Sequence, residues 1–531
     1  MGKMLLYAKS MPITIESWIV SFVSIVLIRI FFEQFSSFQP GRFVLIDMPT
    51  IIHYGVFYLA TTAALMVILI FFAKTNIQEI SAISILGLFI IWLAPIVDLI
   101  SGGIAGHQIG YLFLSGQELL LRFATFFGGH ITSGITLGIQ AEIILGIIFC
   151  YVYVHTATKN ILRAIGAAVA FYCLIFFLVS VPSLMALWLV GQNGPFSLIV
   201  QSIISSHVIQ NNIHPSFTAT NLGLFDLGFN KVMIGVNTII AMIASLFLFF
   251  LGARKKFMAL MKNSRPERIF HFFLLFVLGI SLARPAWFTN WIDIQSYILA
   301  FIALACAWMF SVCQNDIYDE TIDTVSNKNR PFISKELSRN DMNIASKIFL
   351  LFAFLSAYAA GHYVLFFTCL FLFIYFIYSN PPLRLKRFVI LNSFLVGLAC
   401  LSVILTGFFL ASPDKSILAF PPGLVLATIV FFTAVSNVRD IKDADGDCAE
   451  GIKTLPVLLG VKKSKKLIAG IICFFFLLTP WYFHILFLVI PSIIASLLSW
   501  YFITEENYKE WKAFAVYMIY LIFIIGTIVI K

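Results

Sequence analysis

The chain alternates long apolar runs with short polar segments. The runs are continuous and lack the period-two alternation typical of strands in a membrane barrel. A helix of about 20 apolar residues spans the hydrocarbon core of a bilayer. The pattern therefore predicts an all-α polytopic membrane protein with about fifteen transmembrane helices. These helices are expected near residues 14–32, 51–73, 80–101, 135–157, 161–190, 231–252, 269–286, 292–314, 344–361, 363–379, 388–411, 420–437, 466–482, 484–503 and 511–530.

The basic residues fall in the polar segments, on alternating sides of the predicted membrane. Because Lys and Arg accumulate in cytoplasmic loops, the N-terminus and the strongly basic segment 254–268 are predicted to face the cytoplasm. This segment is also the clearest domain boundary. We expect a first membrane domain of about six helices over residues 1–253, in which we recognise no motif. The segment 254–268 is then a linker, and residues 269–531 form a second membrane domain.

The composition agrees with this picture. Charged residues make up 11% of the 531 positions, against about a quarter in soluble proteins. The net charge of +10 is spread over loops between spans, which argues against nucleic acid as a partner. No small-residue cleavage site precedes the first span, so we expect it to be retained. The eight cysteines include no C-x-x-C pair and indicate neither a disulfide framework nor a zinc site.

Two of the polar loops carry the same pattern of aspartates, D-x-x-D-x-x-x-D, and each copy begins where a predicted span ends. The copies are Asp316, Asp319 and Asp323, and Asp440, Asp443 and Asp447. Positions 0, 3 and 7 of a helix lie within about 60° of one another. Each triplet therefore forms one carboxylate face if the span continues as a helix into the loop, and Asp445 falls outside that face. Neither loop has the spacing of an EF-hand.

Carboxylates gathered around one cavity repel each other unless cations neutralise them. Oxygen ligands with open positions suit Mg²⁺, which commonly completes its shell with phosphate oxygens of a substrate. Basic side chains able to bind phosphate stand in the same loops. They are Arg330, Arg384, Lys386, Arg387, Arg439, Lys442 and Lys453, and Asn315 and Asn437 are neutral oxygen donors beside the triplets. The alternative is that these are ordinary solvated loops, but two identical triplets flanking a basic loop favour a site for a phosphorylated substrate.

Three segments together resemble the cytoplasmic signatures of the UbiA superfamily of membrane prenyltransferases. They are NDIYDETIDTVSNKNRP (315–331), YSNPPLRLKR (378–387) and RDIKDADGDCAEGIKTLPVLLG (439–460). The resemblance covers about residues 263–531 and includes the nine-helix count and an Arg-Pro pair before the first helix. It implies a helical bundle around a central cavity. It also implies transfer of a polyprenyl group from an allylic diphosphate to an acceptor, with release of pyrophosphate.

The resemblance implies roles for individual residues as well. The two aspartate triplets would hold two Mg²⁺ ions, which bind the diphosphate of the polyprenyl donor. Further contacts to the substrate would come from Asn315, Arg330, Arg384, Lys386 and Lys453. The active site is expected on the cytoplasmic side of the cell inner membrane, in contact with membrane lipids.

The acceptor stays open between a lipid-soluble and a phosphorylated molecule. The chain lacks the Arg-Thr pair of members resembling 4-hydroxybenzoate transferases, and the loop 378–387 departs from a Tyr-x-x-x-Lys spacing. These departures speak against an aromatic quinone precursor. The first motif is closer to members that prenylate glycerol phosphate lipids.

The first domain contains three ionisable residues in or beside apolar runs, Asp98, Arg122 and Glu142. We expect Asp98 or Glu142 to pair with Arg122, because charges within a membrane need partners. The functional alternative is an outward-facing lipid or sugar site, or a transport path. For the whole chain, the competing hypothesis is a transporter or lipid-binding scaffold with a non-catalytic second half. Two complete aspartate triplets argue against it, since carboxylates without their metal ions are costly to keep.

Overall fold

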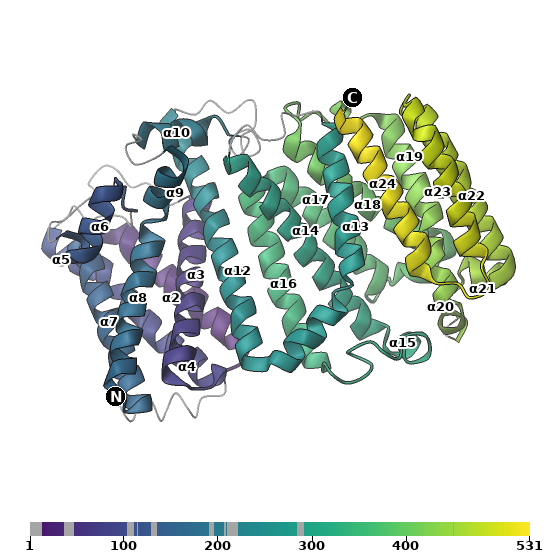
Figure 1. The fold of residues 1–531 in the computed structure, drawn as a ribbon. Coiled ribbons are helices and arrows are strands. Elements are labelled where there is room, and N and C mark those ends of the chain that lie inside the picture. Colours follow the sequence, from purple (N-terminus) through teal and green to yellow (C-terminus); the bar gives the residue numbers. More distant parts are fainter. Residues whose placement is uncertain are drawn as a thin grey trace. The chain divides into compact units, whose positions relative to one another are not determined.

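The computed structural model describes most of the chain as helices (Figure 1). Fourteen helices among the described residues are long and apolar enough to cross a membrane, and they coincide with fourteen predicted spans. The remaining predicted span, 269–286, corresponds to α13 (Pro266–Leu282), which has 17 residues. The prediction of an all-α multi-pass membrane protein is confirmed. The described residues are 13–36, 47–102, 111–113, 115–128, 135–190, 196–206, 209, 221–283, 291–449 and 451–530.

One predicted span is divided in the structure. The run 161–190 forms α8 (Ile161–Val179) and α9 (Val181–Val190), with a break at Ser180. Pro182 lies in the first turn of α9, where the missing backbone N–H leaves no hydrogen bond unmade. This proline explains why a new helix begins after Ser180.

The chain forms two compact units. Unit 1 comprises residues 1–205 and 218–254, and unit 2 comprises residues 206–217 and 255–531. The helix α12 (Asn221–Asn263) has residues in both units, and its backbone leaves helical values at Ala253, with φ −151° and ψ 56°. Most of the segment expected to be a linker is therefore helical.

In unit 1, polar side chains cap several of the helices. Asp47 accepts a hydrogen bond from the backbone of Thr50, and Asn76 from that of Glu79, so that helix N-termini are satisfied. The elements are α2 (Ile15–Ser36), α3 (Met48–Ala73), α4 (Ile77–Leu88), η1 (Phe89–Trp92), α5 (Leu93–Gly102), α6 (Gly116–Ala124), η2 (Phe126–Gly128), α7 (Leu137–Thr158), α8, α9, α10 (Phe196–Ile204) and the first part of α12.

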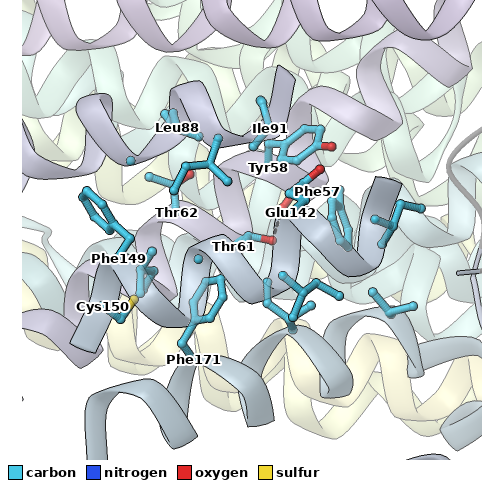
Figure 2. A pocket seen from close by; sticks show the side chains of 18 of the residues that line it. Phe57, Tyr58, Thr61, Thr62, Leu88, Ile91, Glu142, Phe149, Cys150 and Phe171 are labelled. Carbon is cyan, nitrogen blue, oxygen red and sulfur yellow. Dashed lines mark hydrogen bonds between the residues drawn. The ribbon is translucent and has the colours of Figure 1, made fainter. Parts of the chain in front are cut away.

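The expected ion pair in unit 1 is wrong. Asp98 accepts hydrogen bonds from the Thr136 hydroxyl at 2.6 Å and from the Gly138 backbone N–H at 2.8 Å. Arg122 donates to the carbonyl oxygen of Phe127 at 2.9 Å. The N-terminus of α7 supplies free N–H groups and the positive end of a helix dipole, so Asp98 is stabilised without a basic side chain. Glu142 instead lines a cavity of about 1020 Å³ within unit 1 (Figure 2).

Unit 2 contains nine long helices within the part of the chain that the structure describes. They are α13, α14 (Trp291–Tyr318), α16 (Arg339–Ala360), α17 (His362–Ser379), α18 (Val389–Ala411), α19 (Pro422–Val435), α22 (Val461–Tyr482), α23 (Val489–Thr504) and α24 (Glu510–Ile530). Short elements connect them, namely α15 (Glu320–Ser326), η3 (Leu385–Arg387), η4 (Ile417–Ala419), α20 (Asn437–Ala449), α21 (Leu455–Leu459) and η5 (Leu486–Leu488). The most buried long helix is α18, which packs against α13, α17 and α19.

Two glycines set the distance between α13 and α18. A Cβ atom at Gly279 would lie 2.0 Å from the carbonyl oxygen of Ile404, and one at Gly407 would lie 2.1 Å from that of Phe276. Small residues at a membrane helix interface let the two backbones approach closely. This close contact fixes α18 in the centre of unit 2.

Substitution of Gly279 by alanine is expected to lower the melting temperature in detergent. The added methyl group meets backbone rather than a movable side chain, and overpacking of this kind costs about 1–3 kcal/mol. Gly526→Ala in α24 is the control, because no atom lies within 4 Å of its Cβ position. Equal melting temperatures for the two variants would contradict the close contact.

Candidate active site

The first aspartate triplet lies where α14 passes into α15, at the same end of unit 2 as α20 (Figure 1). Asp316 is in the last turns of α14, and Asp319 precedes α15. The backbone N–H groups of Asp319 and Asp323 bond the carbonyls four residues before them, both at 2.9 Å. The chain thus keeps a helical hydrogen-bond pattern across the triplet.

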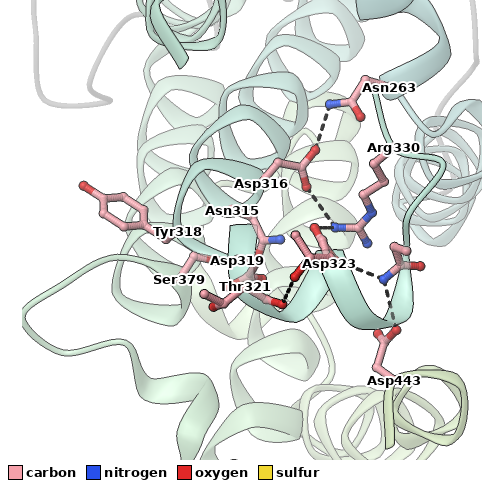
Figure 3. Close-up of polar contacts among 12 residues, drawn as sticks. Asn263, Asn315, Asp316, Tyr318, Asp319, Thr321, Asp323, Arg330, Ser379 and Asp443 are labelled. Atoms are coloured by element: carbon pink, nitrogen blue, oxygen red, sulfur yellow. Dashed lines mark hydrogen bonds and ion pairs between the residues drawn. The ribbon is translucent and has the colours of Figure 1, made fainter. Parts of the chain in front are cut away.

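Asp316 is fully buried and held by three donors. It accepts hydrogen bonds from Asn263 at 2.8 Å and Arg330 at 3.2 Å (Figure 3). Arg265 donates the third, at 2.5 Å. Arg265 occupies the left-handed region, with φ 53°, at the N-cap of α13. The Arg-Pro pair before α13 therefore brings its arginine onto the first aspartate.

Each of the other two carboxylates of this triplet also pairs with basic residues. Asp319 forms ion pairs with Lys386 and, at 3.1 Å, with Arg384. Asp323 pairs with Arg330, which also contacts Asp316. Burial raises the pKa of Asp323 to about 6. Arg330 opposes this rise, while the neighbouring aspartates of the triplet add to it.

The second triplet lies entirely within α20. Asp440 is buried and accepts a hydrogen bond from Asn392 at 3.4 Å, with Arg439 at 3.6 Å. Arg439 donates to the Tyr378 hydroxyl at 2.6 Å and lies over the ring of the same tyrosine. Asp447 is buried as well, and among the described residues its carboxylate has no hydrogen-bond or ion-pair partner.

A single amide joins the two triplets. The side chain of Asn327 donates to Asp323 at 3.0 Å and to Asp443 at 3.3 Å (Figure 3). Asp443 is 116 residues away from Asn327 in the sequence. The helices α15 and α20 pack against each other at this point, so the two loops form one site.

Both triplets face one cavity of about 710 Å³ in unit 2. The predicted residues that line it are Asn315, Asp319, Asp323, Arg330, Lys386, Asp440, Asp443 and Asp447. The remaining candidates do not line it. Asp316 lies behind Arg265 and Arg330, and Arg384 contacts Asp319. Asn437 donates to the carbonyl of Thr433, and the exposed candidates are Arg387, Lys442 and Lys453. Asp445, which the spacing placed outside the face, is exposed.

The cavity has further walls besides the predicted metal and substrate ligands, and of these only Arg439 was named from the sequence. Asn392 and Arg439 supply polar groups, and Trp308, Tyr375 and Tyr378 supply an aromatic side. The rings of Trp308 and Tyr375 lie 5.6 Å apart between centroids. These residues come from α14, α17, α18 and α20, and only the position of Arg439 beside Asp440 was a sequence signal.

The donor set of the cavity suits a divalent cation. Five aspartate carboxylates and the amides of Asn315 and Asn392 line it, and oxygen ligands are those that Mg²⁺ prefers. Within the described residues, no three acidic, histidine or cysteine side chains converge at metal-binding distance. The aspartates of the first triplet instead contact basic side chains. The residues present thus fit Mg²⁺ by their chemistry.

Comparison with known proteins connects this site to a family. Residues 272–524 match the UbiA prenyltransferase family. The chain is 27% identical over 194 residues to a probable homogentisate phytyltransferase 2 of Oryza sativa subsp. japonica, covering 34% of this chain and 50% of that one. It is 31% identical over 150 residues to a digeranylgeranylglyceryl phosphate synthase of Methanothrix thermoacetophila, covering 28% of this chain and 54% of that one.

The chain spans about half the length of these curated relatives. Among solved structures, a UbiA homolog from Archaeoglobus fulgidus bound to DMAPP and Mg²⁺ is 16% identical. The match covers 50% of this chain and 99% of that one, with a TM-score of 0.39. The resemblance read from the three sequence signatures is confirmed by the family match. Residues 272–524 are therefore similar to the UbiA prenyltransferase family.

Proposed function

We propose that unit 2 is a Mg²⁺-dependent prenyltransferase of the membrane. It moves a polyprenyl group from an allylic diphosphate to a lipid-soluble or phosphorylated acceptor and releases pyrophosphate. The observation that carries this proposal is the meeting of two aspartate triplets, joined by Asn327, at one cavity rimmed by basic residues. The family match of residues 272–524 supports it.

In this proposal, the five aspartates that line the cavity bind two magnesium ions, and Asp316, expected as a sixth ligand, instead holds Arg265 and Arg330 at the rim. Bound Mg²⁺ neutralises negative charge that develops on a departing diphosphate. Arg330 and Lys386 line the same cavity and donate to phosphate oxygens, as do Arg384 and Lys453 from its margin. The position of Arg265 against Asp316 keeps an additional positive charge at this rim.

The aromatic side of the cavity suits the other reacting group. When the allylic C–O bond breaks, pyrophosphate leaves with the electron pair and the prenyl carbon becomes positive. The faces of Trp308, Tyr375 and Tyr378 attract a cation and limit the access of water. A nucleophilic atom of the acceptor then bonds to this carbon and loses its proton.

Two relatives by name act on different acceptors. One is named for homogentisate and phytyl transfer, and the other for synthesis of digeranylgeranylglyceryl phosphate. Because the two differ, we propose only the class of acceptor, together with an active site on the cytoplasmic side of the cell inner membrane.

Removal of divalent cations is expected to abolish the release of pyrophosphate. The test uses the full-length protein in detergent, prenyl diphosphates of graded chain length and a membrane lipid extract as the source of acceptor. Excess EDTA should reduce the rate by more than about a hundredfold, and added Mg²⁺ should restore it. The melting temperature in EDTA serves as the control for unfolding.

The same measurement separates the enzyme from a transporter or lipid-binding scaffold. A scaffold releases no pyrophosphate from any donor. A rate that persists in EDTA would contradict the proposed role of the aspartate triplets.

A further inference from the structure

The cavity in unit 1 is a second place in the molecule that is suited to a ligand, and it is independent of the function proposed for unit 2. It has a volume of about 1020 Å³, and it is lined by helices that are long and apolar enough to span a membrane. Its walls are mostly apolar, with Phe57, Leu88, Ile91, Phe149 and Phe171 among the lining residues (Figure 2). Such walls bind the hydrocarbon part of a lipid-soluble molecule.

One carboxylate points into this cavity. Figure 2 shows Glu142, from α7, among the side chains of Tyr58, Thr61 and Phe57. Among the residues that the structure describes, none forms a hydrogen bond or ion pair with the Glu142 carboxylate, although the charge of Arg29, which lines the same cavity, attracts it. A carboxylate that lacks donors within a membrane is costly, and such a residue marks a functional site.

Most other polar groups of the lining already have partners within the protein. Arg29 pairs with Glu33, and the Thr61 hydroxyl donates to the carbonyl of Phe57 at 2.8 Å. Tyr111 bonds His53 at 2.8 Å. Among the described lining residues, these contacts leave the Glu142 carboxylate as an acceptor without a donor and the Nε–H of Arg29 as a donor without an acceptor.

The positive charge of Arg29 distinguishes between two donor groups that a ligand could carry, an ammonium and a hydroxyl. Its guanidinium lines the same cavity and is almost completely buried, so it repels a ligand with an ammonium group. A neutral hydroxyl satisfies Glu142 without this repulsion. We propose that the cavity binds a lipid-soluble alcohol or phenol, whose hydroxyl donates to Glu142 and whose hydrocarbon part lies against the phenylalanine and isoleucine side chains.

The test is photolabelling of the full-length protein in detergent. The probe is a long-chain fatty alcohol that carries a diazirine and a terminal alkyne, and its methyl ether is the matched compound without a hydrogen-bond donor. The alcohol is expected to label peptides of α3 and α7 about tenfold more than the ether, as one hydrogen bond to a charged group predicts. Because this comparison uses the unmodified protein, it does not depend on the folding of any variant.

Three variants test the site. Glu142→Leu should remove the preference for the alcohol over the ether, because leucine has no hydrogen-bond acceptor, whereas Glu16→Leu, on the exposed first turn of α2, should keep it. Thr61→Phe should lower labelling by both compounds, because it fills the cavity. Equal labelling by alcohol and ether in the unmodified protein, or an unchanged preference in Glu142→Leu, would overturn the proposal.

Discussion

Substitution of Asp447 by asparagine is expected to reduce prenyl transfer by about a thousandfold while leaving the protein as stable as before. Asp447 is buried, and no partner holds its carboxylate among the described residues, so its charge adds nothing to the stability of the fold. In the proposed function this carboxylate binds magnesium, and loss of such a charge removes stabilisation of the transition state. The rate of pyrophosphate release and the melting temperature are both measured.

Asp445→Asn is the control for this variant. Asp445 lies on the same helix, α20, but is exposed and does not line the cavity. It should retain the full rate. If Asp447→Asn also kept a rate within threefold of the unmodified protein, the second triplet would have no role in metal binding.

Substitution of Arg330 by alanine is expected to lower both activity and stability. Arg330 pairs with Asp316 and Asp323 at once, and its removal leaves buried carboxylates with fewer partners. We expect a fall of about 5 °C in the melting temperature, given the cost of breaking a buried pair and the partial exposure of this arginine. Arg330→Lys should have an activity and a melting temperature between those of Arg330→Ala and the unmodified protein. Lysine keeps the positive charge, but it cannot contact both carboxylates as the guanidinium does.

The melting temperature of Arg330→Ala can also be measured with added Mg²⁺. If Mg²⁺ binds the same carboxylates, it should restore part of the melting temperature lost in Arg330→Ala. Arg387→Ala, whose side chain is exposed in η3, is the control and should change neither property. A melting temperature of Arg330→Ala equal to that of the unmodified protein would show that these pairs do not stabilise the first triplet.

The arrangement of helices was predictable because hydropathy reports the length of a span directly. The fourteen spanning helices coincide with fourteen of the predicted runs, and the remaining run corresponds to the 17-residue helix α13. The break at Ser180 was not predicted, because the apolar run continues through it and was taken as one span. Pro182, within that run, is the signal that a new helix begins. The pairing expected for Arg122 was wrong because a helix N-terminus, which hydropathy does not report, satisfies Asp98.

Only the two repeated aspartate triplets of the site were predictable from the sequence. The spacing of 0, 3 and 7 places both triplets on helical segments, and the structure brings these segments together. Asn392 was not expected as a member of the site, since it lies outside the three signature segments. Asn327 and Tyr378 lie inside those segments but were given no role, because neither belongs to a periodic pattern. Such residues become visible only when the packing of α15 against α20 is known.

The residues that contact the first triplet are synthesised before the second triplet. Its polar and basic partners, Asn263, Arg265, Asn327, Arg330, Arg384 and Lys386, all precede residue 390. A ribosome therefore delivers every one of them before it reaches α20. The first set of carboxylates can be neutralised while the chain is still being inserted, and the second set arrives at a surface that is already electrically balanced.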